Sequence, residues 1–354
     1  MKKLKVVICG TVFGRYYIEG LRKLTDCYEL AGIFARGSSR SQEYARELGV
    51  PLFTSMEDMD HVEIDLACVV IKSSIVGGKG TDIVQYFLER GVNVLQEHPV
   101  HYNDYVAHMK TARNNGCMYR LNGFYHNVAP VHKFIETAEK LRSTAEFTYL
   151  KAECGIQVLF PLVDIIGRVM GGFRPWKLDI LNAETGQEPF AVITGEIKDV
   201  PVLILIKNEM DSYKPESNMS VLHRLTLGTS KGTLLLTDTH GAVLWTPSIH
   251  EDLKDREKSS DIYHIPVQER VDQNTRYDLG QIVDEMWPDS VRRSLEDYYT
   301  IITGSGNLSQ EHQHYLFACQ MWNDIGKMIG GYHPVKVKTA RPVSLSTIMN
   351  TENS

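Results

Sequence analysis

Short apolar segments alternate with amphipathic ones along the first third of the 354-residue chain. Some of these segments, such as Val6–Cys9 and Leu66–Ile71, are unbroken apolar runs, which is typical of a strand that is buried on both faces of a sheet. The strands that we expect are Val6–Cys9, Glu29–Phe34, Leu66–Ile71, Val92–Gln96 and Met118–Asn122. Strands of this kind, separated by helices, predict an α/β fold with a doubly wound parallel sheet.

The segments between these strands repeat apolar residues at the spacing of a helix. We expect helices over Gly14–Leu24, Arg40–Leu48, Asp82–Arg90 and Asp104–Asn115. Gly49, Gly91 and Gly116 follow the last three of them. Glycine readily adopts the left-handed conformation that ends many helices, so each of these glycines is a predicted helix stop.

The pattern changes near residue 145, because strands then follow one another without helices between them. Ala145–Cys154 is a predicted strand, Phe160–Met170 is an apolar helix, and Leu178–Trp245 is a run of strands joined by turns. Consecutive strands of this kind predict a mainly antiparallel sheet.

Two further helices are expected over Asp289–Thr303 and Gln310–Ile329, and Ser309 is the predicted N-cap of the second. We therefore divide the chain into a domain over residues 1–123, an α+β domain over residues 124–335, and a tail over residues 336–354. The first domain is expected to bind a ligand, and the second to hold the substrate and form oligomer contacts.

The composition excludes several classes of function. The chain is 43% hydrophobic and 23% charged with a net charge of −6, so we expect no surface for nucleic acid or an anionic membrane. The longest apolar runs, such as Val200–Ile206, are too short to span a bilayer, and no signal peptide is recognisable. The six cysteines have no CxxC spacing, which favours a reduced, cytoplasmic protein.

The first predicted strand runs into a glycine turn, Gly10-Thr11-Val12-Phe13-Gly14. Its glycines allow a tight turn in which the backbone N–H groups of Thr11, Val12 and Phe13 face a pyrophosphate. The spacing is G-x-x-x-G rather than the full G-x-G-x-x-G, so a plain strand-to-helix turn is the alternative. Together with the alternating strands and helices, the turn favours a Rossmann domain that binds a dinucleotide.

The end of the second predicted strand indicates which dinucleotide is bound. NAD enzymes usually place Asp or Glu there, whereas this chain has Arg36-Gly37-Ser38-Ser39-Arg40. Arginines and hydroxyls suit a 2′-phosphate, which favours NADPH, and a polar loop that caps the next helix through Ser39 is the alternative. After the third long strand, Lys72, Ser73 and Ser74 are expected to border the pyrophosphate, unless their glycine-rich loop makes no ligand contact.

Titratable side chains follow the fourth long strand, in Gln96-Glu97-His98-Pro99-Val100-His101. Ligands of open α/β sheets bind at the carboxyl ends of the strands, so these groups are predicted to face whatever is bound there. His98 is a candidate acid, and a structural histidine bonded to backbone is the alternative. His101 is a further candidate. The two histidines also have the spacing of a metal pair, but no third ligand follows at the usual distance, and we expect no metal.

Four motifs stand together in the first part of the chain: Gly10-x-x-x-Gly14, Gly37-Ser38-Ser39-Arg40-Ser41, Gln96-Glu97-His98-Pro99 and Asn122-Gly123-Phe124-Tyr125. With them the chain resembles the thiazolinyl imine reductases, which are stand-alone reductases of siderophore assembly lines. These belong to the glucose-fructose oxidoreductase/inositol dehydrogenase superfamily. Sugar dehydrogenases of that superfamily carry Glu-Lys-Pro where this chain has Glu97-His98-Pro99, which argues against a sugar alcohol as the substrate.

The resemblance implies that NADPH reduces a thiazolinyl C=N bond to a thiazolidine, on a substrate carried by a nonribosomal peptide synthetase. The nitrogen gains electron density as hydride reaches the carbon, so a donor with a pKa near the working pH lowers the barrier. His98 is the first candidate for this acid, and Tyr125, in the Phe-Tyr motif of the family, is the second. Glu97 is placed among the cofactor-binding residues, and a homodimer is expected.

Other interpretations stay open. The protein is alternatively an NADP-dependent reductase of a sugar or cyclic ketone, or a non-catalytic NADP-binding regulator with the same fold. Asp164, an acid in an apolar helix, is either a buried carboxylate with a partner or a group that faces the nicotinamide. His126 is expected to face solvent. Core packing is expected for Trp245, Trp287 and Trp322, and an aromatic pocket is the alternative.

Overall fold

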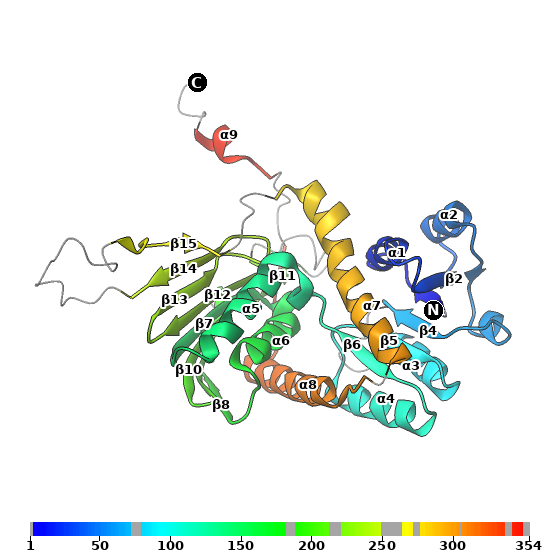
Figure 1. The fold of residues 1–354 in the computed structure, drawn as a ribbon, viewed down its shortest axis with the longest axis horizontal. Helices are drawn as coiled ribbons and strands as arrows, with labels where there is room; N and C mark the ends of the chain where they lie inside the picture. The colour runs from blue at the N-terminus through cyan, green and yellow to red at the C-terminus, as the bar shows by residue number, and fades with distance from the viewer. Residues whose placement is uncertain are drawn as a thin grey trace, which may run out of the picture.

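A computed structural model of the chain describes residues 3–71, 79–181, 188–211, 221–248, 264–271, 277–304, 306–336 and 342–349. Its first part forms a six-stranded parallel sheet in the order β3-β2-β1-β4-β5-β6 (Figure 1). The strands are β1 (Leu4–Cys9), β2 (Tyr28–Phe34), β3 (Leu52–Phe53), β4 (Leu66–Val69), β5 (Asn93–Glu97) and β6 (Tyr119–Asn122). The predicted doubly wound sheet is confirmed, and its strand order reverses between β1 and β4, where such sheets bind ligands.

Helices connect the strands of this sheet. They are α1 (Gly14–Arg22), α2 (Ser39–Leu48), the short turn η1 (Glu57–Met59), α3 (Lys79–Glu89) and α4 (Tyr102–Asn114). The predicted stops Gly49, Gly91 and Gly116 all have positive φ, as a left-handed helix end requires. The edge strand β3 was not predicted, because two residues are too few to show a periodic pattern.

The second sheet has eight strands in the order β15-β14-β13-β12-β7-β10-β9-β8. They are β7 (Phe147–Gly155), β8 (Trp176–Ile180), β9 (Phe190–Ile197), β10 (Val200–Lys207), β12 (His223–Thr229), β13 (Gly232–Leu236), β14 (Val243–Pro247) and β15 (Glu269–Arg270). Among these described strands only β7 and β10 pair in parallel, which confirms the mainly antiparallel sheet.

Two helices pack against one face of the eight-stranded sheet (Figure 1). They are α5 (Ala129–Arg142) and α6 (Leu159–Met170), and they follow the short turns η2 (Tyr125–Asn127) and η3 (Ile156–Val158). The apolar helix α6 was predicted from its sequence. Helix α5 was not predicted; it buries Val131, Phe134 and Ala138 on one side.

The last two long helices return to the first sheet. A π-helical turn, η5 (Gln281–Met286), leads into α7 (Trp287–Thr303), which packs against α1, and α8 (Ser309–Ile329) packs against α4 and α6. The predicted N-cap of α8 is wrong by one residue, because Leu308 holds that position. The N–H of Ser309 donates instead to Asn307 Oδ1 at 2.7 Å.

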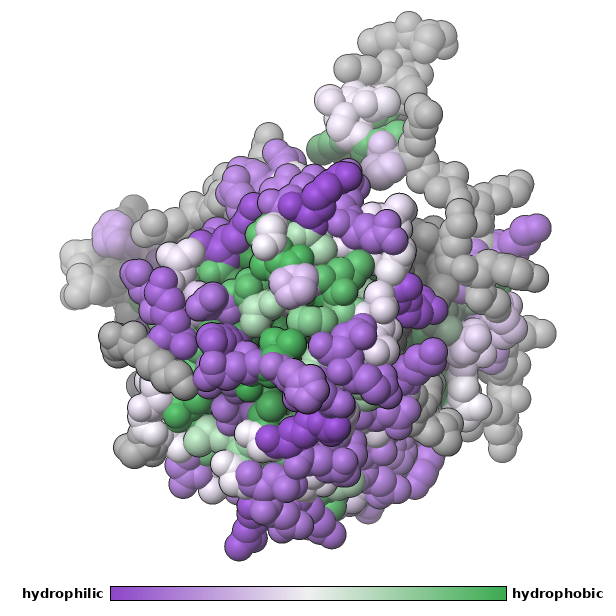
Figure 2. All heavy atoms as spheres, turned by 90° about the vertical axis from the view of Figure 1, so that its right-hand side faces the viewer, coloured by the Kyte–Doolittle hydropathy of each residue, from purple (hydrophilic) through white to green (hydrophobic). Residues whose placement is uncertain are grey.

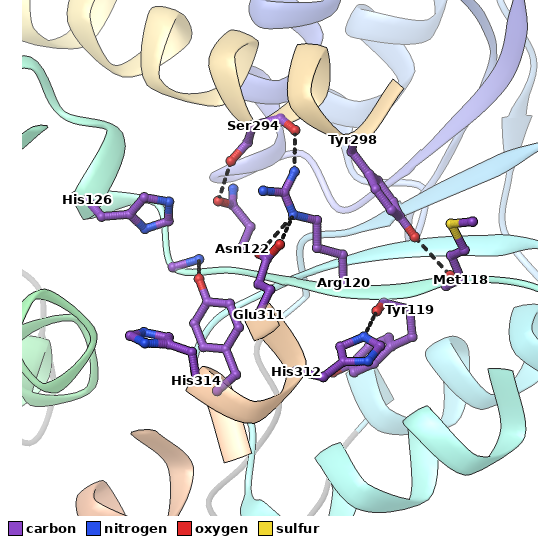
Figure 3. A network of polar contacts seen from close by, with 12 residues as sticks. Met118, Tyr119, Arg120, Asn122, His126, Ser294, Tyr298, Glu311, His312 and His314 are labelled. Atoms are coloured by element: carbon purple, nitrogen blue, oxygen red, sulfur yellow. Dashed lines mark hydrogen bonds and ion pairs between the residues drawn. The ribbon is translucent and has the colours of Figure 1, made fainter. Parts of the chain in front are cut away.

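Polar contacts tie the edge strand β6 to these helices (Figure 3). Arg120 is 8% exposed; its Nε atom lies 2.9 Å from Glu311 Oε1, and its Nη1 atom donates to the carbonyl of Ser294 at 2.9 Å. The Tyr298 hydroxyl donates to the carbonyl of Met118 at 2.9 Å. The edge of the first sheet is therefore joined to α7 and α8, and the predicted boundary at residue 123 stays a prediction.

Three short elements complete the described chain: β11 (Glu209–Asp211), its partner β16 (His333–Val335), and α9 (Leu345–Met349). None of the described helices is both long and apolar enough to cross a bilayer.

On the side at which α2 lies in Figure 1, apolar side chains form a patch with polar ones around it (Figure 2). Such patches are typical of contact surfaces for other proteins.

Candidate active site

His98 lies at the carboxyl end of β5, beside the end of β6. Its Nδ1 atom is 2.8 Å from Glu97 Oε1 and 3.0 Å from the carbonyl oxygen of Asn122. Both neighbours are acceptors, so Nδ1 carries the hydrogen of the neutral ring. The Nε2 atom makes no hydrogen bond with any residue that the structure describes. It is therefore the atom that can exchange a proton with a bound substrate.

The surroundings of His98 favour its protonated form. Burial lowers the pKa of the ring, because only 11% of the side chain is exposed. The negative charge of Glu97 and the hydrogen bonds to Glu97 and Asn122 more than offset this, and the pKa lies above its ordinary value. The ring is also held in place, since it stacks on Phe160 at a centroid distance of 5.8 Å. These are properties that a general acid requires.

Glu97 is held in turn by α1 and β6. One carboxylate oxygen, Oε2, accepts hydrogen bonds from the Tyr17 hydroxyl and from Asn122 Nδ2, the latter at 3.2 Å. Asn122 Oδ1 accepts from the hydroxyl of Ser294 in α7 at 2.8 Å (Figure 3). The structure therefore gives Glu97 a position that orients His98, and its predicted contact with the cofactor stays a prediction.

Tyr125 follows a γ-turn at the end of β6. Phe124 has φ 51° and ψ −64°, and the N–H of Tyr125 donates to the carbonyl of Gly123 at 2.6 Å. This backbone geometry is rare and strained for a residue with a side chain, and such strain is concentrated at functional sites. The Tyr125 ring lies 5.9 Å from the His98 ring, centroid to centroid. The structure thus brings the two predicted acids together.

Asp164 is a fully buried carboxylate beside this turn. It accepts hydrogen bonds from His126 Nδ1 at 2.9 Å, from His314 Nε2 at 2.7 Å and from Arg168 Nε at 2.9 Å. Burial acts to raise its pKa, but the Arg168 charge and the hydrogen bonds from the histidines hold the pKa well below its ordinary value. The interpretation of Asp164 as a carboxylate with partners is confirmed. The solvent-facing position expected for His126 is wrong, since this residue is 9% exposed.

Sequence reasoning missed two further histidines, His223 beside Tyr125 and His240 beside Trp287. The ring of His223 packs against the Tyr125 ring at 4.8 Å, and its Nε2 donates to the carbonyl of Val158 at 3.1 Å. Burial lowers the pKa of His223 to about 3, so this ring is neutral and structural. His240 lies in the turn between β13 and β14 and accepts a hydrogen bond from the indole of Trp287 at 3.0 Å. The sequence predicted turns between the strands of Leu178–Trp245 but did not indicate which residue the imidazole of His240 contacts.

The glycine turn between β1 and α1 suits a pyrophosphate. Gly10 has φ +99°, and a Cβ there would lie 2.7 Å from the carbonyl oxygen of Val70, so only glycine fits. No side chain caps the start of α1, and the N–H groups of Thr11, Val12 and Phe13 donate to no described residue. Free amides at a helix N-terminus are the groups that hold a phosphate.

The end of β2 suits a 2′-phosphate. Arg36 and Arg40 are both exposed, and neither forms an ion pair with a described residue. The helix cap that the alternative interpretation assigned to Ser39 is made by Ser38, whose Oγ accepts from the N–H of Ser41 at 3.3 Å. Two unpaired guanidinium groups at this position are available for charge-assisted hydrogen bonds to a phosphate.

The structure does not place two groups of predicted residues in the candidate active site. Lys72, Ser73 and Ser74 lie outside the described residues, so their contact with the pyrophosphate stays a prediction. His101 is the N-cap residue of α4, and its Nδ1 accepts from the N–H of Asn103 at 3.4 Å. The structure records no contact between His101 and either His98 or Tyr125, and the helix cap accounts for this residue.

Comparison with protein families gives two matches along the chain. A family described as an oxidoreductase family with an NAD-binding Rossmann fold matches residues 4–123. A second family, described as thiazolinyl imine reductase Irp3-like, C-terminal, matches residues 145–246. Together the two matches identify the chain as an oxidoreductase of the GFO/IDH/MocA superfamily with a thiazolinyl imine reductase Irp3-like C-terminal region. As a member of this family it is an NAD(P)-dependent oxidoreductase.

Solved structures share the fold over nearly the whole chain. An oxidoreductase from Agrobacterium radiobacter, in complex with NAD+, L-tartaric acid and magnesium, is 10% identical, with a TM-score of 0.69 over 93% of this chain and 97% of the other. The WlbA dehydrogenase from Bordetella pertussis, in complex with NADH and UDP-GlcNAcA, is 12% identical, with a TM-score of 0.68 over 95% and 99%.

Biliverdin reductase from Synechocystis sp. PCC 6803, in complex with biliverdin and NADP+, is 13% identical, with a TM-score of 0.67 over 92% of this chain and 99% of the other. Identities this low show the shared fold alone, and one fold can serve many different substrates. In a search of curated proteins, none matched the sequence of this chain.

Proposed function

We propose that this oxidoreductase reduces the C=N bond of a thiazolinyl imine to a thiazolidine, with NADPH as the reductant. The observation that carries the proposal is the state of His98. Its Nδ1 is tied to Glu97 and Asn122, its Nε2 has no described partner, and its ring lies 5.9 Å from that of Tyr125. The match of residues 145–246 to thiazolinyl imine reductases supports the substrate class.

In this reaction the chain's own residues must supply a proton to the imine nitrogen. Bound NADPH supplies a hydride to the carbon of the C=N bond. The nitrogen then needs a proton, and a donor within hydrogen-bond reach lowers the barrier. His98 holds a proton more readily than an ordinary histidine, because Glu97 stabilises the charged ring. We assign the donation to His98 Nε2, and Tyr125 binds or relays the same proton through its hydroxyl.

The choice of NADPH rests on the end of β2. Arg36 and Arg40 are unpaired among the described residues, and no acid stands between them to accept from a ribose hydroxyl. A guanidinium group gains from a dianionic 2′-phosphate and gains little from a neutral hydroxyl. The proposal therefore includes a preference for NADPH over NADH.

The proposed substrate is carried on the phosphopantetheine arm of a carrier domain, so the proposed partner is a nonribosomal peptide synthetase in the cytoplasm. We further propose that the protein is a homodimer. Leu203 and Leu205 of β10 alternate with the buried Val202, Ile204 and Ile206, so they point to the sheet face opposite α5 and α6. A half-exposed apolar sheet face of this kind suits a contact with a second copy of the chain.

Turnover with a soluble substrate mimic tests the proposed function. The purified protein is mixed with NADPH and a 2-aryl-thiazoline thioester, and in parallel with a panel of sugars and cyclic ketones. We expect oxidation of NADPH and formation of a thiazolidine with the first, and no turnover with the panel. Turnover of a sugar or ketone alone contradicts the proposal, and binding of NADPH without turnover of any of these compounds indicates a regulator.

A further inference from the structure

His240 brings the second sheet to the cofactor side of the candidate active site. It lies in the turn that joins β13 to β14, and its Nε2 accepts from Trp287 Nε1 at 3.0 Å. Trp287 begins α7, and its ring lies 6.1 Å from that of Phe13, in the glycine turn, and 6.0 Å from that of Phe124. The imidazole is therefore separated by one aromatic ring from both the dinucleotide turn and the γ-turn that precedes Tyr125.

The same turn is anchored beside Tyr125. The hydroxyl oxygen of Thr239 accepts from the backbone N–H of His223 at 3.1 Å and lies 2.9 Å from His223 Nδ1. The His223 ring packs against the Tyr125 ring at 4.8 Å. Two contacts thus hold this turn. Thr239 contacts His223, which packs against Tyr125, and His240 contacts Trp287, which packs against the glycine turn. A side chain held in this way keeps its direction when a ligand binds.

The contact with Trp287 determines where His240 carries its hydrogen. An indole N–H only donates, so His240 Nε2 must accept, and the hydrogen lies on Nδ1. Burial lowers the pKa of His240 to about 4, so the ring is neutral near pH 7. The Nδ1–H group donates to no residue that the structure describes. A half-buried donor that is held in place and has no partner among the described residues is available to a ligand.

We propose that His240 binds the substrate, and that its Nδ1–H donates to a carbonyl oxygen that the substrate carries next to the reducible ring. The proposal rests on the proposed function, in which a thioester carbonyl is attached to the thiazoline ring. A neutral donor suits this task, because it recognises the carbonyl and does not compete with His98 for the role of acid. The site then selects imines with an adjacent carbonyl over imines without one.

The test compares two mimics that differ only in this carbonyl: a 2-aryl-thiazoline methyl ester and the ether in which CH₂ replaces the C=O group. We expect His240→Phe to lower kcat/KM for the ester roughly tenfold, mainly through KM, because one hydrogen bond is lost. The ether is expected to change by less than about twofold, since it forms no such bond. His240→Asn, whose side-chain amide replaces the donor, is expected to restore most of the preference for the ester.

A second variant tests the same contact without changing the imidazole. Trp287→Phe removes the N–H that fixes the tautomer of His240, so we expect a smaller loss that is again confined to the ester. His61→Phe, at an exposed position after η1, is the matched control and should leave both mimics unaffected. Melting temperature and NADPH affinity, measured on every variant, show whether each one is folded.

Each outcome decides a different claim. Equal losses for ester and ether in folded His240→Phe, or no loss for either, overturn the role of His240 and leave the proposed function standing. A Trp287→Phe enzyme with an unchanged preference for the ester, or a His240→Asn enzyme without that preference, also counts against it. A wild-type enzyme that reduces neither mimic overturns the proposed function and this inference with it.

Discussion

The Nδ1 atom of His98 lies 2.8 Å from a carboxylate oxygen of Glu97, the residue that precedes it in the chain. The two side chains act as one unit, because Tyr17 and Asn122 hold the other carboxylate oxygen and so fix the direction of the pair. The unit supplies a ring that is readily protonated, and its Nε2 has no partner among the residues that the structure describes. This arrangement can donate a proton to a substrate atom that gains negative charge when a neighbouring atom accepts hydride.

The substitution His98→Asn removes the proposed acid, Nε2, and keeps an N–H group that can donate to Glu97. The asparagine amide stands where Nδ1–H stands, so the contact with Glu97 is retained while Nε2 is lost. We expect kcat to fall by roughly 10²- to 10⁴-fold with little change in NADPH affinity. Steady-state kinetics and a cofactor titration measure the two effects. The control is His101→Asn, which keeps a good helix cap and should stay active.

The charge of Glu97 sets the pH at which His98 works. His98 must be protonated to donate, so kcat/KM is highest below its raised pKa and falls as the pH rises through that pKa. Glu97→Gln removes the charge that raises the pKa. We expect the basic limb of the pH–rate profile to move to lower pH. A profile that keeps its basic limb in place would show that another group titrates there.

The Tyr125 hydroxyl and His98 are expected to act on the same proton. Tyr125→Phe keeps the ring contacts with His98 and His223 and removes only the hydroxyl. We expect a loss in kcat of at least tenfold. The double variant with His98→Asn should then lose little more than the more damaging single variant, because residues that act as a unit are not additive. Losses that multiply would assign the two residues to separate steps.

Gly123 has no space for the methyl group of alanine. A Cβ there would meet the carboxylate of Asp164 and lie 2.8 Å from the Tyr315 hydroxyl. Gly123→Ala should therefore lower the unfolding free energy by about 1–3 kcal/mol. In contrast, a Cβ at Gly326 in α8 meets nothing, and Gly326→Ala should raise it by about 0.5–1 kcal/mol. Denaturant unfolding of both variants gives the comparison, and two changes of the same sign would refute it.

Buried histidines make the fold sensitive to acid. Burial lowers the pKa of His126 and of His240 to about 4 and that of His223 to about 3. As the pH falls below 6.5, the unfolded chain binds protons that the folded protein does not, so the unfolding free energy decreases. Each unit of pKa difference is worth about 1.4 kcal/mol per group, and we expect a total loss of several kcal/mol by pH 4.

Denaturant unfolding at pH 7.5, 6 and 5 checks this slope. Asp164 does not contribute within this window, because its lowered pKa in the folded protein makes its contribution disappear only at lower pH. His223→Asn, which removes one of the titrating groups, should give a shallower slope than the wild type. A wild-type unfolding free energy that stays constant or rises between pH 7.5 and pH 5 is incompatible with neutral, buried histidines.

The sequence predicted what local patterns can encode. Strands such as β1 show as unbroken apolar runs because both faces are buried, and helix ends show as glycines with positive φ. His98 and Tyr125 follow adjacent strands, β5 and β6, and the ends of adjacent parallel strands meet at one edge of a sheet. Their proximity could therefore be predicted from their places in the chain.

The rest depends on contacts between residues far apart in the chain. His126 is buried because Asp164 of α6 lies against it, and nothing near His126 in the sequence indicates that partner. The N–H of Trp287 fixes His240 from a different helix. The strained backbone at Phe124 is set by the surrounding fold, since the residue type itself disfavours it. Local pattern cannot predict such contacts.

Transfer of a labelled hydride tests the central claim most directly. The wild-type protein is given NADPH that carries deuterium at both C4 positions, together with a 2-aryl-thiazoline thioester, and the product is analysed by mass spectrometry and NMR. A C=N reductase places one deuterium on the former imine carbon of a thiazolidine and an exchangeable solvent proton on its nitrogen. A thiazoline that is recovered unchanged and without deuterium would contradict the account.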